Sequence, residues 1–442
     1  MMLALVDEDG YGSHPMFDWI KKNLFGRQPQ VDPYDQCVIE FIEECRRQGC
    51  VLSSYDHQDR SFRFGTDAGL KVQLDNLFAS WLPLDQHGRA EAVAKFVRSI
   101  VESGENTEIS PETLSEQLMP GIRARTLIGG AMLQNWIAGA PADGTTEIAW
   151  LPFAGDLAAC VVWDKPLTMA PMTRLNLKFA DIPIDRAMSR AMTNFRARMP
   201  AVVFEPVGKG VFGCNMLDDH QSALLLLQLG KDYVVPPLEG TPVALVPSRN
   251  TFYVTGSANT AGLTTLLDRS ETASQLPHFC SSMILQWAGD RWSEFHFDSG
   301  TANADRQRRI ALDRLTNDYR VQKQLLDQFY QKQSLDIPVS EVLVFHKPNQ
   351  ETSLVTVTAL GSAARGTLLP QVERLNFVKQ TIDPRTGQAQ ADDVADVAWS
   401  EAMDVVGSLL EPVPYLYPPR FRALGFPDAV AWAKLKALTR QK

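Results

Sequence analysis

One long helix constrains the fold of this chain more than any other feature of its sequence. Between about Ala302 and Gln333, apolar side chains recur at spacings typical of a helix, with Gln322 interrupting the stripe; they are Leu312, Leu315, Tyr319, Leu326 and Phe329. At 1.5 Å per residue this helix is about 45 Å long. Its apolar stripe is narrow and its other faces are charged, so one side must pack while the rest meets water.

The long helix is predicted to end before Pro338, which disfavours a helical conformation at Ile337. The sequence beyond it has strands, turns and helices of its own, so we predict a domain boundary near residues 334–338. The predicted parts are a loosely attached N-terminal arm (1–32), an α+β domain (33–301), the connecting helix (302–335) and a small C-terminal α+β domain (336–442).

The composition is that of an ordinary globular protein. Of 442 residues, 45% are hydrophobic and 21% are charged, which excludes a wholly disordered chain and a collagen-like repeat. The 52 acidic residues outnumber the 43 basic ones, giving a formal net charge of −9. This acidic balance argues against nonspecific binding to nucleic acid, so we expect no nucleic-acid partner.

The cysteines and the apolar segments indicate the compartment. None of the six cysteines belongs to a CxxC pair, and Cys37, Cys45 and Cys50 lack the spacing of zinc ligands, so we expect reduced thiols, no metal and no cofactor. The N-terminal apolar run meets acidic residues and has no basic flank, unlike a signal peptide. The apolar stretches 127–140 and 223–229 are too short to cross a bilayer, so we predict a cytoplasmic protein with no membrane association.

The segments before the long helix mix helices and strands without regular alternation. Residues 33–48 and 88–102 have helical periodicity, whereas residues 61–74 alternate like a hairpin. Further strand pairs are predicted within 241–255 and 282–297. The irregular order favours an α+β fold with a mixed or antiparallel sheet over a parallel, doubly wound one.

Three further elements are predicted from local patterns. A buried helix is expected at Ala223–Leu229, after a pair of aspartates. In the C-terminal part, a hairpin surrounds Lys347-Pro348-Asn349, and a helix is expected from Asp392 or Asp393 to about Leu410. An Asp at such a position is a common N-cap.

The candidate with the strongest local chemistry is Asp218-Asp219-His220, between an apolar strand and an apolar helix. A carboxylate beside an imidazole can orient a base or bind a metal. The structural alternative, which we favour, makes Asp218 or Asp219 the helix N-cap and places His220 in solvent. No phosphate-binding loop, GxSxG elbow or HExxH motif accompanies the cluster, and the sequence identifies no catalytic residue.

Other candidate sites have weaker patterns. Arg186 and Arg190 are four residues apart on a predicted helix, where they suit an anionic ligand or form a solvated basic face. His278 and Cys280 would share one face of a strand, although their apolar surroundings favour core packing over an activated thiolate. The Pro-rich segment around Tyr415 and Tyr417 is either an interaction surface or an ordered connector.

Several segments together resemble the bacterial YtpQ-like family over about residues 50–300. They include Tyr55–Phe64, Gly69–Leu74, Phe195–Pro200, Leu217–Leu225 and the Pro247-Ser248-Arg249-Asn250 turn. The function of that family is unknown, so the resemblance implies a fold unit and a cytosolic setting but no activity. The long helix and residues 336–442 lie outside it.

The sequence as a whole favours a non-catalytic binding protein over an enzyme. The expected partner is another protein or a small anionic ligand, and the oligomeric state is not predicted. The alternative is a hydrolase-like enzyme that uses Asp219 and His220, with or without a metal.

Overall fold

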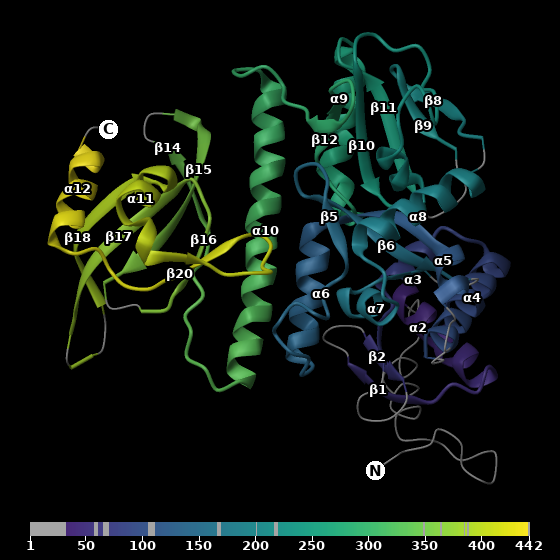
Figure 1. Ribbon diagram of the computed structural model, residues 1–442, viewed down its shortest axis with the longest axis horizontal. Coiled ribbons are helices and arrows are strands. Elements are labelled where there is room, and N and C mark those ends of the chain that lie inside the picture. Colours follow the sequence, from purple (N-terminus) through teal and green to yellow (C-terminus); the bar gives the residue numbers. More distant parts are fainter. Residues whose placement is uncertain are drawn as a thin grey trace. The chain divides into compact units, whose positions relative to one another are not determined.

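The computed structural model (Figure 1) describes residues 32–56, 61–64, 70–104, 111–165, 169–199, 201–215, 220–347, 350–362, 365–383, 385–386 and 389–440. Its contacts divide the chain into two units. The first comprises Met1–Leu118, Val162–Ala170 and Gln275–His278, and the second comprises Met119–Val161, Pro171–Ser274 and Phe279–Lys442. The predicted arm at 1–32 lies almost wholly outside the described residues.

The first unit packs helices around a small antiparallel sheet. Its elements are α2 (Pro33–Arg47), β1 (Leu52–Asp56), β2 (Ser61–Phe64), β3 (Leu70–Gln73), α3 (Asp75–Trp81), α4 (Gln86–Gly104) and α5 (Pro111–Gln117). The predicted hairpin is confirmed, because β2 and β3 pair antiparallel. Helix α2 begins where the Asp32 side chain accepts the Tyr34 N–H at 2.8 Å, and it buries Phe41 in a core with Phe62 and Trp81.

The second unit begins with short strands and helices that lead into a larger sheet. These elements are β4 (Leu118–Ala124), α6 (Arg125–Ile137), β5 (Trp150–Pro152), β6 (Leu157–Asp164), α7 (Arg174–Phe179) and α8 (Ile184–Arg198). The end of β6 and most of the short strand β7 (Met169–Pro171) belong to the first unit. The apolar stretch 127–140 lies largely in α6, a helix that the sequence analysis did not predict. Antiparallel pairing of Trp150 with Cys160 joins β5 to β6 and places the turn between them, which carries Asp156.

A six-stranded antiparallel sheet follows, with strand order β13-β12-β10-β11-β9-β8. Its elements are β8 (Phe204–Gly208), β9 (Val211–Cys214), η1 (Gln221–Leu226), β10 (Pro242–Ser248), β11 (Thr251–Gly256), α9 (Thr260–Thr272), η2 (Ala273–Gln275), β12 (Ile284–Trp287) and β13 (Trp292–Glu294). Helix α9 buries Leu263, Leu266 and Leu267 against this sheet. Both predicted strand pairs are confirmed, β10 with β11 and β12 with β13.

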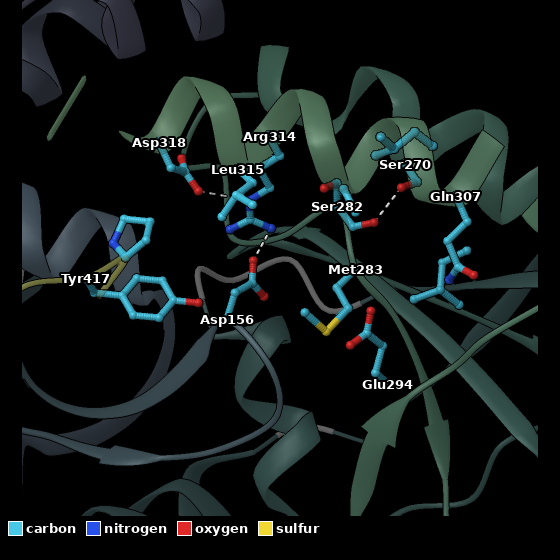
Figure 2. A pocket seen from close by; sticks show the side chains of 14 residues that line it. Asp156, Ser270, Ser282, Met283, Glu294, Gln307, Arg314, Leu315, Asp318 and Tyr417 are labelled. Carbon is cyan, nitrogen blue, oxygen red and sulfur yellow. Dashed lines mark hydrogen bonds and ion pairs between the residues drawn. The ribbon is translucent and has the colours of Figure 1, made fainter. Parts of the chain in front are cut away.

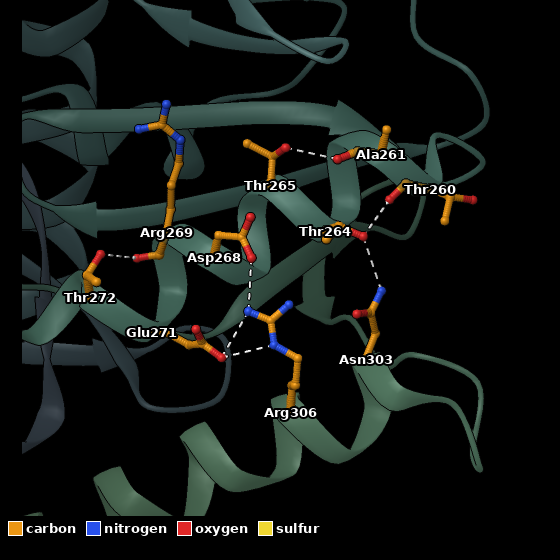
Figure 3. A network of polar contacts seen from close by, with 10 residues as sticks. All are labelled: Thr260, Ala261, Thr264, Thr265, Asp268, Arg269, Glu271, Thr272, Asn303 and Arg306. Atoms are coloured by element: carbon orange, nitrogen blue, oxygen red, sulfur yellow. Dashed lines mark hydrogen bonds and ion pairs between the residues drawn. The ribbon is translucent and has the colours of Figure 1, made fainter.

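Helix α10 (Ala302–Lys332) confirms the long helix and both of its predicted ends within a residue. The Thr301 hydroxyl accepts the Ala304 N–H at 3.2 Å and caps the start. Figure 3 shows how the first turns attach to α9: Arg306 lies 2.9 Å from Asp268 and 3.0 Å from Glu271, and Asn303 donates to the Thr264 hydroxyl. These contacts fix the rotation of α10 about its own axis.

The C-terminal part of the second unit has two further sheets, with orders β14-β15-β17-β18 and β16-β20-β19. Its elements are β14 (Leu343–Lys347), β15 (Gln350–Gly361), β16 (Leu368–Pro370), β17 (Arg374–Ile382), β18 (Ala389–Ala398), α11 (Trp399–Val406), η3 (Gly407–Leu409), β19 (Leu410–Pro412), β20 (Arg420–Ala423) and α12 (Ala429–Arg440). Strands β15 and β17 are parallel, and the other pairs are antiparallel. The α+β class is therefore confirmed.

Two local predictions were wrong. The helix expected from Asp392 or Asp393 begins only at Trp399, because Ala395 and Val397 are buried at alternate positions of β18 and pair with β17. The buried helix expected at Ala223–Leu229 is instead the 3₁₀-helix η1, which starts and ends earlier.

The predicted boundary at 334–338 lies inside the second unit. One apolar cluster contains Trp136 of α6, Leu326 and Tyr330 of α10, and Leu368 and Leu416 from the C-terminal part. Gln322, which interrupts the apolar stripe of α10, is itself buried, and its amide donates to the Pro418 carbonyl at 2.8 Å. Independent folding of residues 336–442 stays a prediction.

Candidate functional site

A cavity of about 140 Å³ opens in the second unit beside α10. Six of its lining residues lie at spacings of three or four along the helix and therefore share one face; they are Gln307, Ile310, Ala311, Arg314, Leu315 and Asp318. The opposite walls come from the turn at Asp156, from β12 and β13, and from the segment around Tyr417 (Figure 2). Elements distant in sequence thus converge on one hollow.

Three carboxylates line this cavity, but only one guanidinium does. Arg314 forms an ion pair with Asp156, and its Nε lies 3.6 Å from an oxygen of Asp318. The third carboxylate, Glu294, ends β13 at an exposed position on the rim and has no ion-pair partner in the described part of the chain. The lining charges sum to negative when all three acids are ionised.

Asp156 is held in place by a small network. The Ser281 hydroxyl donates to its carboxylate at 2.9 Å, and Arg314 in turn donates to the Ser281 oxygen at 3.1 Å. The Asp156 carbonyl accepts the Arg125 N–H at 2.8 Å, which ties the turn to the start of α6. Gly155 precedes it at a φ of +54°, a backbone conformation that favours glycine.

All three carboxyl groups have raised pKa values, and burial is the largest cause for each. The pKa of Asp156 is raised although Arg314 and Ser281 favour its ionised form. The pKa of Asp318 is raised to about 6, with the neighbouring Asp156 charge adding to the effect of burial. Partial burial raises the pKa of Glu294 in the same direction. Such clusters of shifted carboxyl groups in a cavity are characteristic of functional sites.

Replacing Asp318 with Asn is expected to give a pH-dependent gain in relative stability. A pKa of about 6 in the folded protein, above the ordinary value of 3.8 for an aspartic acid, means that the unfolded chain loses this proton first as pH rises. The carboxyl group therefore costs stability above about pH 4, and by about 3 kcal/mol once it is ionised in both states. Urea unfolding at several pH values should show the free energy of unfolding of D318N rising relative to wild type between pH 4 and 7. A difference that is constant with pH would contradict the shifted pKa.

Of the predicted Asp218-Asp219-His220 cluster, the structure describes His220 alone. Asp218 and Asp219 lie outside the described residues. The expectation that His220 is solvated was wrong: its side chain is buried, 6.1 Å from the Phe195 ring by centroids, and its Nδ1 lies 3.4 Å from the Pro120 carbonyl oxygen. His220 does not line the cavity beside α10.

The other predicted candidates have separate locations. Arg186 and Arg190 lie one turn apart on the exposed side of α8 and do not line the cavity. Cys280 is fully buried, and burial raises the pKa of its thiol to about 11, which disfavours a thiolate. His278 has a φ of +54°, so this segment is not the extended strand on which the two side chains would share a face.

Of the residues in the cavity, sequence analysis had singled out only Tyr417, as part of a Pro-rich segment. In the sequence, Arg314 and Asp318 are two of the many charged residues outside the apolar stripe of the long helix, and no local pattern distinguishes Asp156 or Glu294 from other acids. The available signal was the polar pair at Arg314 and Asp318 beside an apolar Leu315, which marks a mixed face rather than a solvated one.

Comparisons with models of protein families, with curated proteins and with solved structures found no match. Within the described ranges, no three His, Cys, Asp or Glu side chains are grouped so that they could hold a metal ion, and we assign no metal to the cavity. In the same part of the chain, no helix is both long and apolar enough to cross a membrane. None of the six cysteines forms a disulfide.

Proposed function

We propose that this chain is a binding protein whose cavity beside α10 takes a small organic cation. The observation that carries the proposal is the imbalance of charge in the cavity: Asp156 and Asp318 share the guanidinium of Arg314, while Glu294 has no ion-pair partner among the described residues. The positive charge that acts on Glu294 is that of His296, which does not line the cavity. A positively charged ligand supplies the missing charge. It also offsets the cost of holding partly buried carboxylates.

The rest of the cavity limits the size and shape of this cation. Apolar side chains of Ile284, Ile310 and Leu315 form part of the wall. An apolar cavity of about 150 Å³ holds benzene, so a cavity of about 140 Å³ has space for about six non-hydrogen atoms. A short alkylamine or alkyldiamine matches both features, because its methylene groups can lie on the apolar wall while an ammonium group meets Glu294.

Binding of a cation should also release protons near pH 6. A positive charge beside Asp318 and Glu294 lowers their pKa values, which burial raises. This proton release distinguishes binding in the cavity from nonspecific association of a cation with surface charges.

The resemblance to the YtpQ-like family adds a fold unit and a cytosolic setting but no activity, and membership of that family is itself part of this proposal. So are the cytoplasmic location and a protein partner. The hydrolase alternative, with Asp219 and His220, receives no support from the cavity, since His220 is buried elsewhere in the second unit.

Calorimetric titration with 1,4-diaminobutane and with butylammonium tests the proposal on the full chain. We expect saturable binding. E294Q should weaken it about tenfold, because the variant loses one charge-assisted hydrogen bond to the ammonium group. At pH 6, the binding enthalpy measured in buffers of different ionisation enthalpy should differ in proportion to the number of protons released.

The matched control is D305N, which removes an exposed carboxylate from the first turn of the same helix and should bind like wild type. If neither amine binds, or if E294Q and D305N have equal effects, the cavity is not a cation site.

A further inference from the structure

A second cavity, of about 200 Å³, lies in the same unit and is lined by aromatic rings and two arginines. The residues that give it its character are Arg125, Glu147, Trp150, Arg174, Tyr415 and Tyr417. Arg125 begins α6 and Arg174 begins α7, while the two tyrosines come from the segment between β19 and β20.

Glu147, the one carboxylate in this lining, is fully engaged. One of its oxygens lies 2.8 Å from Nε of Arg174, and the other accepts the indole N–H of Trp150 at 2.9 Å. Its side chain is buried, and each of its carboxylate oxygens already has a partner. The lining of this cavity therefore retains one positive charge, which belongs to Arg125.

Arg125 forms no ion pair in the described part of the chain, although its charge, together with that of Arg314, favours the ionised form of Asp156 outside this lining. Its guanidinium lies 4.0 Å from the ring centre of Tyr417 and 5.0 Å from that of Trp150. These are contacts of the guanidinium with aromatic rings, and they satisfy none of its N–H donors. Its Nε is buried without a hydrogen-bond acceptor. A buried donor left unsatisfied is costly, which makes an absent acceptor the simplest explanation for this group.

The geometry points to an aromatic carboxylate, about the size of benzoate, as the ligand of this second cavity. The N–H donors of a guanidinium lie in its own plane, the direction in which a carboxylate accepts two hydrogen bonds. The neighbouring Trp150, Tyr415 and Tyr417 can contact a flat apolar ring. Benzene occupies a cavity of about 150 Å³, so about 200 Å³ accommodates a ring with a carboxylate attached.

This site differs in charge from the cavity beside α10 and does not depend on the cation proposed there. It also differs from the Arg186 and Arg190 pair that the sequence suggested for an anion. Those two side chains lie on an exposed helix face and are not part of this lining.

Titration of the full chain with benzoate tests the inference, by calorimetry and by the fluorescence of the protein, since Trp150 lines the cavity. We expect saturable binding that weakens with rising salt. R125Q should weaken it at least tenfold, and R125K should weaken it as well, because an ammonium cannot replace the planar pair of donors. R186Q changes an exposed arginine on α8 and should leave binding unchanged.

Benzamide, a neutral molecule of the same shape, provides a test that needs no variant. On the unaltered protein it should bind at least tenfold more weakly than benzoate. Absence of saturable benzoate binding, equal binding of benzoate and benzamide, or equal affinities of folded R125Q and R186Q would each overturn the assignment.

Discussion

Replacing Arg314 with Met is expected to lower the free energy of unfolding by about 3–5 kcal/mol at neutral pH, the cost of removing one partner of a buried ion pair. Asp156 is 8% exposed, and Arg314 is its ion-pair partner. Without the guanidinium, Asp156, Asp318 and Glu294 line the same cavity with no cation among them. Urea unfolding monitored by circular dichroism measures the loss.

The deficit of R314M should shrink as pH falls. Removing the guanidinium raises the pKa values of the carboxyl groups further, so in the folded variant they take up protons at a higher pH than in the unfolded chain. Protonation removes the uncompensated charge, and stability is recovered in acid.

R309M is the control, because Arg309 lies on the same helix with an exposed side chain, and its effect should stay within about 0.5 kcal/mol. A loss in R314M that is small, or independent of pH, would show that the pair with Asp156 does not stabilise the fold.

Replacing Arg420 with Met is expected to cost about 3 kcal/mol, mainly from acceptors left unsatisfied. This arginine is 1% exposed, yet it pairs with neutral groups instead of a carboxylate. Its donors reach the Gln322 side-chain oxygen at 2.6 Å, the Ser340 carbonyl at 2.8 Å and the Tyr319 carbonyl at 3.2 Å. Burial lowers the pKa of Arg420 to about 10, so relief of the buried charge offsets part of the loss.

A double-mutant cycle isolates the contact between Arg420 and Gln322. Q322L alone leaves Arg420 with fewer acceptors, whereas R420M with Q322L removes donor and acceptor together. We expect the double variant to be more stable than the sum of the two single losses implies, because apolar groups then face each other. Strict additivity would mean that Gln322 and Arg420 do not depend on each other.

The periodicity of apolar residues predicted those helices and hairpins whose structure is determined by their own local sequence. Helix α10 and the hairpins β10–β11 and β12–β13 follow directly from the spacing of their apolar residues. The segment 389–410 did not, since Asp393 has the appearance of an N-cap until pairing with β17 is known. At this position, pairing with a neighbouring strand outweighs the preference of Asp393 for a helix N-cap. No local sequence pattern reveals that pairing.

The candidate site was beyond prediction for a similar reason. Asp156, Glu294 and Arg314 belong to a turn, a strand end and a helix, and only the packing of the second unit brings them to one cavity. In the sequence, each is one of many charged residues. Tyr417 was noticed through its Pro-rich surroundings, but the two cavities beside it could not be inferred from that pattern.

The position of Tyr417 has a thermodynamic consequence. The same residue lines both cavities, and its ring contacts Arg125 on the side of the second. A ligand that shifts this ring in one cavity therefore alters the shape of the other. Because such coupling is reciprocal, a cation that strengthens carboxylate binding by some factor must have its own binding strengthened by the same factor. One aromatic side chain would then make two small sites a single cooperative receptor.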